Sequence, residues 1–122
     1  MRRMSTSDPE INVEKLKRAV LVTVEGRIDS SNASMLDSTL RENMNEGYSN
    51  VIVNLSAVDY MSSAGLRALV SASRECRKKR GDLVISTPST RVAEVFELAG
   101  LTTGSTPLFT IYESDASAVG SF

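Results

Sequence analysis

The sequence of 122 residues has no histidine, no tryptophan and a single cysteine, Cys76. Without histidine the chain cannot build a Ser-His-Asp triad, a Cys-His pair or a histidine-based zinc site. One cysteine forms neither an intrachain disulfide nor a thiolate cluster, which fits a reducing compartment. Aromatic residues make up only 5%, so no aromatic-rich sugar cleft accompanies the carboxylates. We therefore expect a protein that is not an enzyme and that uses no metal and no cofactor.

Long apolar runs and a surplus of basic charge are also missing. No apolar run approaches the roughly 18 residues of a membrane span, and the opening MRRMSTSDPE has no apolar stretch after its arginines. The net charge of −1 does not favour a nucleic-acid partner. The basic residues between 74 and 80 stand at the end of a predicted helix, where cations suit the helix dipole. We expect a cytoplasmic protein that neither binds nucleic acid nor inserts into a membrane.

Segments rich in apolar and β-branched residues alternate along the chain with segments of helical periodicity. Strands are predicted at 11–16, 19–26, 51–55, 83–86 and 108–112. Helices are predicted at 30–46, 63–80, 88–99 (with Leu98 facing inward) and 113–119. This alternation predicts an α/β fold with a mostly parallel sheet of four to five strands and covering helices. Residues 1–9 are expected to be a flexible tail, and residues 10–122 a single domain.

A pair of serines stands where the second long helix is predicted to begin, in the segment YMSSAGLRALV at 60–70. Residues 56–62 are predicted to be a loop that lies beside residues 29–32, at the sheet edge where α/β proteins bind ligands and partners. A serine at this place is either an ordinary helix cap or a hydroxyl that is phosphorylated near the positive end of the helix dipole. A hydrolase elbow is disfavoured because Met61 stands where its first glycine belongs.

The segment VIVNLSAVDYMSSAGLRALV resembles the signature of the STAS domain, as found in bacterial anti-sigma factor antagonists. That signature is a strand, an Asp-Leu-Ser-like turn, and then Tyr/Phe-Met-Asp/Ser-Ser-x-Gly-Leu opening a helix. VEGRIDSSNASMLDSTL resembles the family's other marker, and STPSTRVAEVFELAGLTTGSTPLFTIYES resembles its usual ending. The resemblance covers about residues 11–119 and implies the STAS fold.

The resemblance also implies a switch. Family members bind an anti-sigma factor that is also a serine kinase of the GHKL type. The kinase releases the antagonist by phosphorylating it, and a PP2C-type phosphatase restores it. Alignment of Gly65 and Leu66 places the phosphorylated residue at Ser63, with Ser62 as the alternative. The implied partner-binding residues, of which Asp29 is expected near that hydroxyl, are Asp29, Ser30, Ser31, Asn32, Met61, Ser62, Ala64, Gly65 and Arg67.

Two positions depart from the family pattern. Ser62 replaces a residue that is commonly acidic, and Asn54 replaces an aspartate at the end of the middle strand. Both changes reduce the negative charge around the site, and Ser62 adds a second candidate acceptor. Two other functions remain open: a STAS subunit of a lipid-transport or transporter complex without phosphorylation, and a scaffold or response module outside sigma control. An intact Ser63 favours the phosphorylated switches over the transport subunit.

Overall fold

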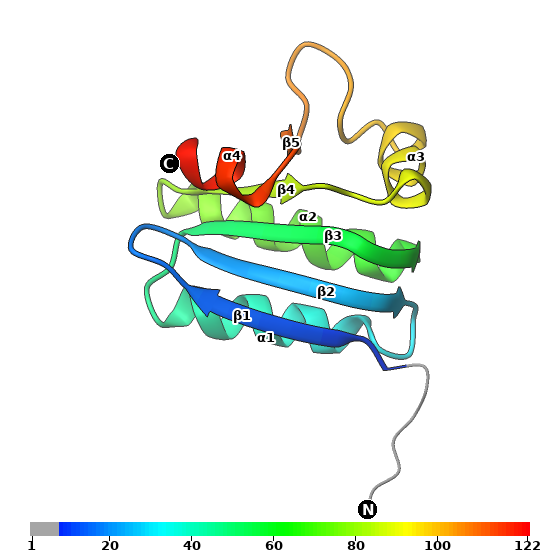
Figure 1. Ribbon diagram of the computed structural model, residues 1–122, viewed down its shortest axis with the longest axis horizontal. Coiled ribbons are helices and arrows are strands. Elements are labelled where there is room, and N and C mark those ends of the chain that lie inside the picture. The colour runs from blue at the N-terminus through cyan, green and yellow to red at the C-terminus, as the bar shows by residue number, and fades with distance from the viewer. Residues whose placement is uncertain (1–7) are drawn as a thin grey trace, which may run out of the picture.

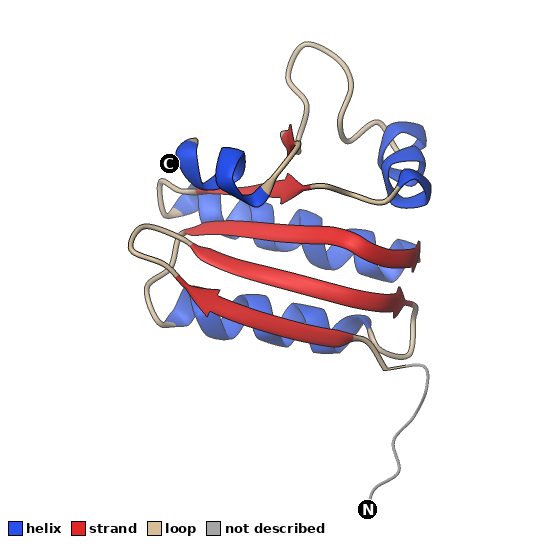
Figure 2. Ribbon diagram, viewed as in Figure 1, coloured by secondary structure: helices blue, strands red, loops and turns tan. Residues whose placement is uncertain are grey.

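The computed structural model describes residues 8–122, which form one five-stranded sheet and four helices (Figure 1, Figure 2). The strands are β1 (Glu10–Lys15), β2 (Val20–Ile28), β3 (Asn50–Met61), β4 (Asp82–Ser86) and β5 (Ile111–Tyr112). The helices are α1 (Ala33–Asn45), α2 (Ser63–Lys78), α3 (Thr90–Leu98) and α4 (Asp115–Gly120). Of the predicted tail at 1–9, only Asp8 and Pro9 belong to the described residues; the rest lies outside them.

The strands follow one another across the sheet in the order β1-β2-β3-β4-β5. β1 runs antiparallel to β2, and the other neighbouring strands are parallel. Parallel neighbours need a crossover connection, and α1, α2 and α3 supply these connections. The predicted α/β fold with a mostly parallel sheet is therefore confirmed.

One face of the sheet carries most of the hydrophobic core. Figure 1 shows α1 and α2 side by side behind the sheet, whereas α4 packs against β3 and β4. Because side chains alternate along a strand, every second residue of β2 faces the larger core, namely Val20, Val22 and Val24. A smaller cluster lies under α4 and contains Ala19, Ile52, Val84 and Ala118. Packing against the larger core holds α1 and α2 in place. It thereby also positions the segments that connect β2 to α1 and β3 to α2.

β3 is longer than the sequence suggested, because residues 56–61 continue the strand instead of forming a loop. β2 is longer too, so the two strands stay paired as far as Ile28 and Met61. Val58 and Met61 are buried, and their side chains hold the extension against the core. Two register shifts interrupt the regular pairing of this extension. The polar residues between the apolar ones had suggested a loop.

The segment before the C-terminal helix is mostly irregular. Only Ile111 and Tyr112 form β5, so the strand predicted at 108–112 is largely a loop. Phe109 packs instead against Phe96 of α3, with ring centroids 5.5 Å apart. The prediction that Leu98 faces the core is wrong, since 89% of this residue is exposed. Phe96 already fills the inward face of the last turn of α3.

The single thiol lies in the core near the end of α2. Cys76 is fully buried, and its Sγ is 3.6 Å from the Sδ of Met44 on α1. Burial raises the pKa of the thiol to about 11. Because the thiolate is the reactive form of cysteine, Cys76 is a packing residue at neutral pH.

Candidate functional site

Two strand-to-helix junctions lie next to each other at one edge of the sheet. The β2–α1 junction comprises residues 29–32, and the β3–α2 junction comprises residues 62–65. β2 and β3 are parallel neighbours with Ile28 paired to Met61, and the Ser62 amide donates to the Ile28 carbonyl at 2.8 Å. Residues 29–32 were predicted to lie beside a loop at 56–62; most of that loop is strand, and its last residue, Ser62, does lie beside the start of residues 29–32.

The two serines of the β3–α2 junction have different environments. Ser62 is the N-cap of α2, and its Oγ accepts a hydrogen bond from the Gly65 amide at 3.2 Å. Ser63 is the first helical residue and is exposed. Its hydroxyl makes no hydrogen bond to any of residues 8–122. Capping is therefore the role of Ser62, and the Ser63 hydroxyl is available to a partner or to modification.

Gly65 lets α2 approach the ends of β2 and β3 closely. A Cβ atom at this position would lie 2.4 Å from the Sδ of Met61 and 2.6 Å from the Cγ2 of Ile28. Both distances are too short for any side chain, so only glycine fits without displacing its neighbours. The β3–α2 junction is thus held by close packing beneath Ser63.

The β2–α1 junction is held by polar side chains. Asn32 is 1% exposed; its Oδ1 accepts from the Asp29 amide at 2.9 Å, and its Nδ2 donates to the Arg27 carbonyl at 3.1 Å. The Asp29 carboxylate accepts from the Ser31 hydroxyl at 2.6 Å and from the Ser31 amide at 2.9 Å. These two hydrogen bonds, with Arg27 nearby, hold the pKa of the Asp29 carboxyl below its ordinary value of 3.8.

The sequence reasoning missed Arg27 and Tyr60. The two residues are paired across β2 and β3, and the Arg27 guanidinium lies 4.7 Å from the centre of the Tyr60 ring. Arg27 Nε also lies 3.5 Å from the Asp29 carboxylate. Each residue stands two positions before its junction. This matching position predicts that the two side chains are neighbours only if β2 and β3 are known to stay paired as far as Ile28 and Met61. Together with Arg91 they line a groove of about 510 Å³ beside the junctions.

The structure divides the predicted partner-binding residues into three groups by exposure. Ser30, Ser31 and Arg67 are exposed. Asp29, Ser62 and Ala64 are half-buried. Asn32, Met61 and Gly65 are buried. The first two groups supply the accessible atoms of the two junctions, whereas the side chains of the buried group lie beneath them.

Asn54, which stands where the family has an aspartate, belongs to the opposite face of the sheet. Its Nδ2 donates to the Asp115 carboxylate of α4 at 2.9 Å. The hydroxyl of Ser86 donates to the same carboxylate oxygen at 2.6 Å. Asp115 of α4 thus places a carboxylate beside the position at which β3 has an asparagine instead of the family's aspartate. The hydrogen bond from Asn54 to Asp115 holds α4 against the sheet.

Comparison with known proteins assigns this arrangement to a family. The model of the STAS domain matches residues 10–118, and the chain belongs to the STAS family. A relative from Bordetella bronchiseptica, provisionally named anti-sigma factor antagonist BtrV, is 28% identical over 113 residues. That alignment covers 93% of this chain and 94% of BtrV.

Solved structures share the fold at lower identity. An anti-sigma factor antagonist from Mycobacterium paratuberculosis superposes with a TM-score of 0.81 at 22% identity, covering 93% of this chain and 92% of the other. SpoIIAA, an anti-sigma factor antagonist, superposes in its unphosphorylated form with a TM-score of 0.70 at 18% identity, covering 92% of this chain and 96% of the other. The phosphorylated form of SpoIIAA from Bacillus superposes with a TM-score of 0.71 at 19% identity, covering 92% of this chain and 98% of the other.

Membership of this family defines a regulatory binding domain and not an enzyme, in agreement with the expectation from the sequence. Among residues 8–122 no group of three or more metal-ligating side chains is placed to hold an ion. Within the same range, no helix has the length and apolar character needed to cross a membrane.

Proposed function

We propose that this protein is an anti-sigma factor antagonist that is switched off by phosphorylation of Ser63, with residues 10–122 as its single domain. The observation that carries the proposal is the unused hydroxyl of Ser63, exposed at the first position of α2. The neighbouring Ser62 already caps the helix, so Ser63 is the better acceptor of the two. The names of BtrV and SpoIIAA support the regulatory role.

The proposed partner is an anti-sigma factor that is also a serine kinase of the GHKL type. A PP2C-type phosphatase removes the phosphate and restores binding, and both reactions take place in the cytoplasm. The contact surface consists of the accessible residues around Ser63, namely Asp29, Ser30, Ser31, Ser62, Ala64 and Arg67. The buried Asn32, Met61 and Gly65 keep this surface in shape.

Phosphorylation acts through charge and needs no refolding. A phosphate adds about −1.5 to −2 charges at neutral pH. One unit charge about 4 Å from a partner carboxylate costs roughly 4 kcal/mol at an effective dielectric constant near 20. Even half of this cost weakens binding about thirtyfold. SpoIIAA supports the absence of refolding, because it shares the fold of this chain in both its phosphorylated and its unphosphorylated form.

The decisive experiment begins with an affinity pull-down and mass spectrometry to identify the kinase partner. The purified kinase and ATP are then used to label the wild-type protein, Ser63→Ala and Ser62→Ala. We expect one phosphate on the wild type, none on Ser63→Ala, and most of the labelling on Ser62→Ala. Full labelling of Ser63→Ala would move the site to Ser62.

Titration calorimetry then measures the switch itself. We expect the unmodified protein and Ser63→Ala to bind the kinase, and the phosphorylated protein to bind about thirtyfold more weakly. Ser63→Asp should bind the kinase with an intermediate affinity, because aspartate carries a single charge and is shorter than phosphoserine. Equal affinities for phosphorylated and unmodified protein would reject the switch. A transporter permease in the pull-down would instead support a transport subunit.

A further inference from the structure

A crevice runs between α1 and α2, beginning beside the proposed phosphorylation site. It consists of three hollows of about 280, 430 and 230 Å³. Arg67 and Ser71 line both the first and the second hollow, and Arg41 and Glu75 line both the second and the third. The hollows therefore form one continuous feature, which we call the α1–α2 crevice. From Ala64 to the residue after Lys78 it spans about 22 Å along α2.

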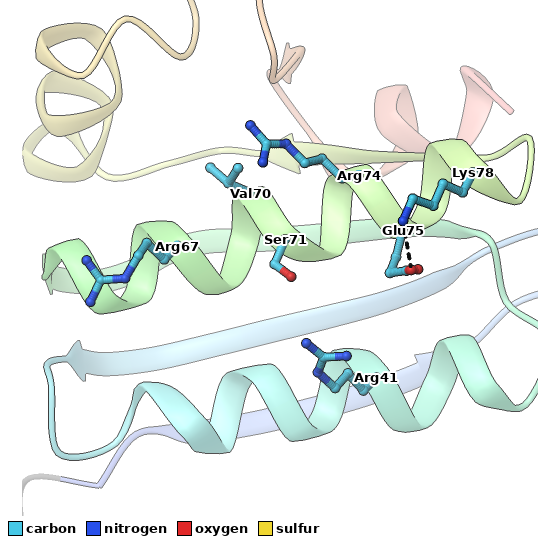
Figure 3. A pocket seen from close by; sticks show the side chains of 7 residues that line it. All are labelled: Arg41, Arg67, Val70, Ser71, Arg74, Glu75 and Lys78. Carbon is cyan, nitrogen blue, oxygen red and sulfur yellow. Dashed lines mark ion pairs between the residues drawn. The ribbon is translucent and has the colours of Figure 1, made fainter.

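The walls of the α1–α2 crevice are mainly basic. Five cations line it, from Arg41 on α1 to Lys79 after α2, against only two carboxylates, those of Asp37 and Glu75. Figure 3 shows Arg41 rising from α1 toward α2, with Ser71 and Glu75 facing α1 between the basic side chains. Since the whole chain has a net charge of −1, positive charge is concentrated on this face.

Two of these cations lack a partner of their own. Arg41 pairs with Asp37 at 2.9 Å, and Lys78 lies 3.9 Å from Glu75. Arg67 and Arg74 form no ion pair with any of residues 8–122. These two exposed arginines stand about two turns apart on α2, with Arg74 directed away from α1 in Figure 3, and both are available to bind anions.

We propose that the α1–α2 crevice binds an acidic segment of the protein that recognises Ser63, so that one partner contacts both places. This inference rests on the proposed function, because it extends the same contact surface along α2. The rim near Ser63 contains the small residues Ala33, Ser34, Ala64 and Ala68, which allow a partner backbone to approach. A length of about 22 Å accommodates about four turns of helix or seven extended residues.

The composition of the crevice favours a protein segment over a nucleic acid. Proteins that bind single strands place aromatic side chains where bases stack, and no aromatic residue lines any of the three hollows. Duplex binding rests on neutralising many phosphates at once. Two unpaired arginines on a chain of net charge −1 suit the few carboxylates of a peptide.

The crevice also connects with phosphorylation through Arg67. Ser63 and Arg67 are four residues apart on α2, the spacing at which an anion that precedes a cation pairs with it on a helix. A phosphate on Ser63 would therefore attract the Arg67 guanidinium and withdraw it from an acidic segment in the crevice. Phosphorylation would weaken binding at both places.

The test uses an acetylated, fluorescein-labelled 16-residue peptide of repeating Glu-Glu-Ala-Leu and the full-length protein at 50 mM salt. Fluorescence anisotropy measures affinity, and amide chemical shifts of ¹⁵N-labelled protein locate the peptide. The test variant is Arg67→Glu/Arg74→Glu. Lys17→Glu/Arg18→Glu, in the turn before β2, is the matched control because it changes the net charge by the same amount. We expect shifts along α1 and α2, at least tenfold weaker binding for the test variant, and less than a twofold change for the control.

Several results would overturn the proposal: no binding of the peptide, shifts located elsewhere, or equal weakening in both variants. Tighter binding of a 16-nucleotide oligothymidylate in the same crevice would assign it to nucleic acid instead. The peptide assay involves no kinase, so its failure leaves the Ser63 labelling result intact. Conversely, failure of the labelling leaves a positive peptide result interpretable. Spectra of both variants without peptide establish that the fold is unchanged.

Discussion

The β3–α2 and β2–α1 junctions follow neighbouring parallel strands and start neighbouring helices, yet they are held in different ways. At the β3–α2 junction, Gly65 packs against Ile28 with no room for a side chain, and one hydrogen bond to Ser62 caps the helix. At the β2–α1 junction, the buried Asn32 bonds to the backbone on either side of Ile28. Packing stabilises the first junction, and polar side chains stabilise the second.

This difference explains why one hydroxyl is unused. At the β2–α1 junction, the Ser31 hydroxyl is bound to the Asp29 carboxylate. At the β3–α2 junction, packing and a single cap suffice, and the exposed Ser63 hydroxyl contributes nothing to the fold. A phosphate placed on Ser63 therefore breaks no hydrogen bond among residues 8–122. Four predictions test the comparison.

The largest effect is expected from Gly65→Val. The added side chain collides with Met61 and with the stiff Ile28, and overpacking of this kind costs about 3 kcal/mol. Urea unfolding followed by circular dichroism measures the loss. Gly120→Val in α4 is the control, because nothing lies within 4 Å of a Cβ there. Equal costs at the two glycines would show that packing does not hold the β3–α2 junction.

A smaller loss is expected from Asn32→Ala in the β2–α1 junction. Removing the amide leaves the Arg27 carbonyl and the Asp29 amide without their partner, at a cost of about 2 kcal/mol in the free energy of unfolding. Asn45→Ala, an exposed position on the same helix, should change stability by less than about 0.5 kcal/mol. If both variants unfold at the same urea concentration, polar side chains do not hold this junction.

The two serines should differ in stability as well as in labelling. Ser62→Ala removes the cap of α2 and should cost about 1 kcal/mol. Ser63→Ala removes a hydroxyl without a bond and should be neutral within about 0.5 kcal/mol. Thermal unfolding of the two variants and the wild type under the same conditions measures these differences in stability. A larger loss for Ser63→Ala would exchange their assigned roles.

The smallest effect is expected from the titration of Asp29. Its pKa is lower in the folded protein than its ordinary value of 3.8, so its contribution is fully present above that value. It is lost as pH falls through the folded pKa. The difference in stability between the wild type and Asp29→Asn should therefore be constant above about pH 5 and shrink below about pH 4. Unfolding curves from pH 7 to pH 2.5 test this.

Much of the fold could be predicted from the sequence because its strands and helices have strong, distinct periodicities. The apolar runs at β3 and β4 and the caps before α2 and α3 predict where these elements begin to within a few residues. The extension of β3 could not be predicted, because its pairing depends on β2, which is distant in sequence. The short β5 was overestimated because Phe109, which suits a strand, is instead buried against α3.

The candidate site was predicted in outline but not in detail. The residue pattern placed Ser63 at a helix start and Asp29 beside it in the sheet order. It did not distinguish exposed from buried members, so Asn32, Met61 and Gly65 were counted as contacts although they are buried. Periodicity predicts which face of a helix or strand is buried, but it does not predict how deeply each residue of a strand-to-helix junction is buried. The pairing of Arg27 with Tyr60 depends on that same tertiary detail.

Helix α2 carries two potentially reactive side chains, the buried thiol of Cys76 and the exposed hydroxyl of Ser63. The thiol near the end of α2 reacts with alkylating or oxidising reagents only after α2 has come away from α1 and the sheet. In the folded molecule, the proposed phosphorylation of Ser63 at the start of α2 is therefore expected to be insensitive to oxidants. The same property provides an internal reporter, since the rate at which a maleimide modifies the protein measures how often α2 opens. Comparing that rate before and after phosphorylation would show whether the modification loosens the helix that carries it.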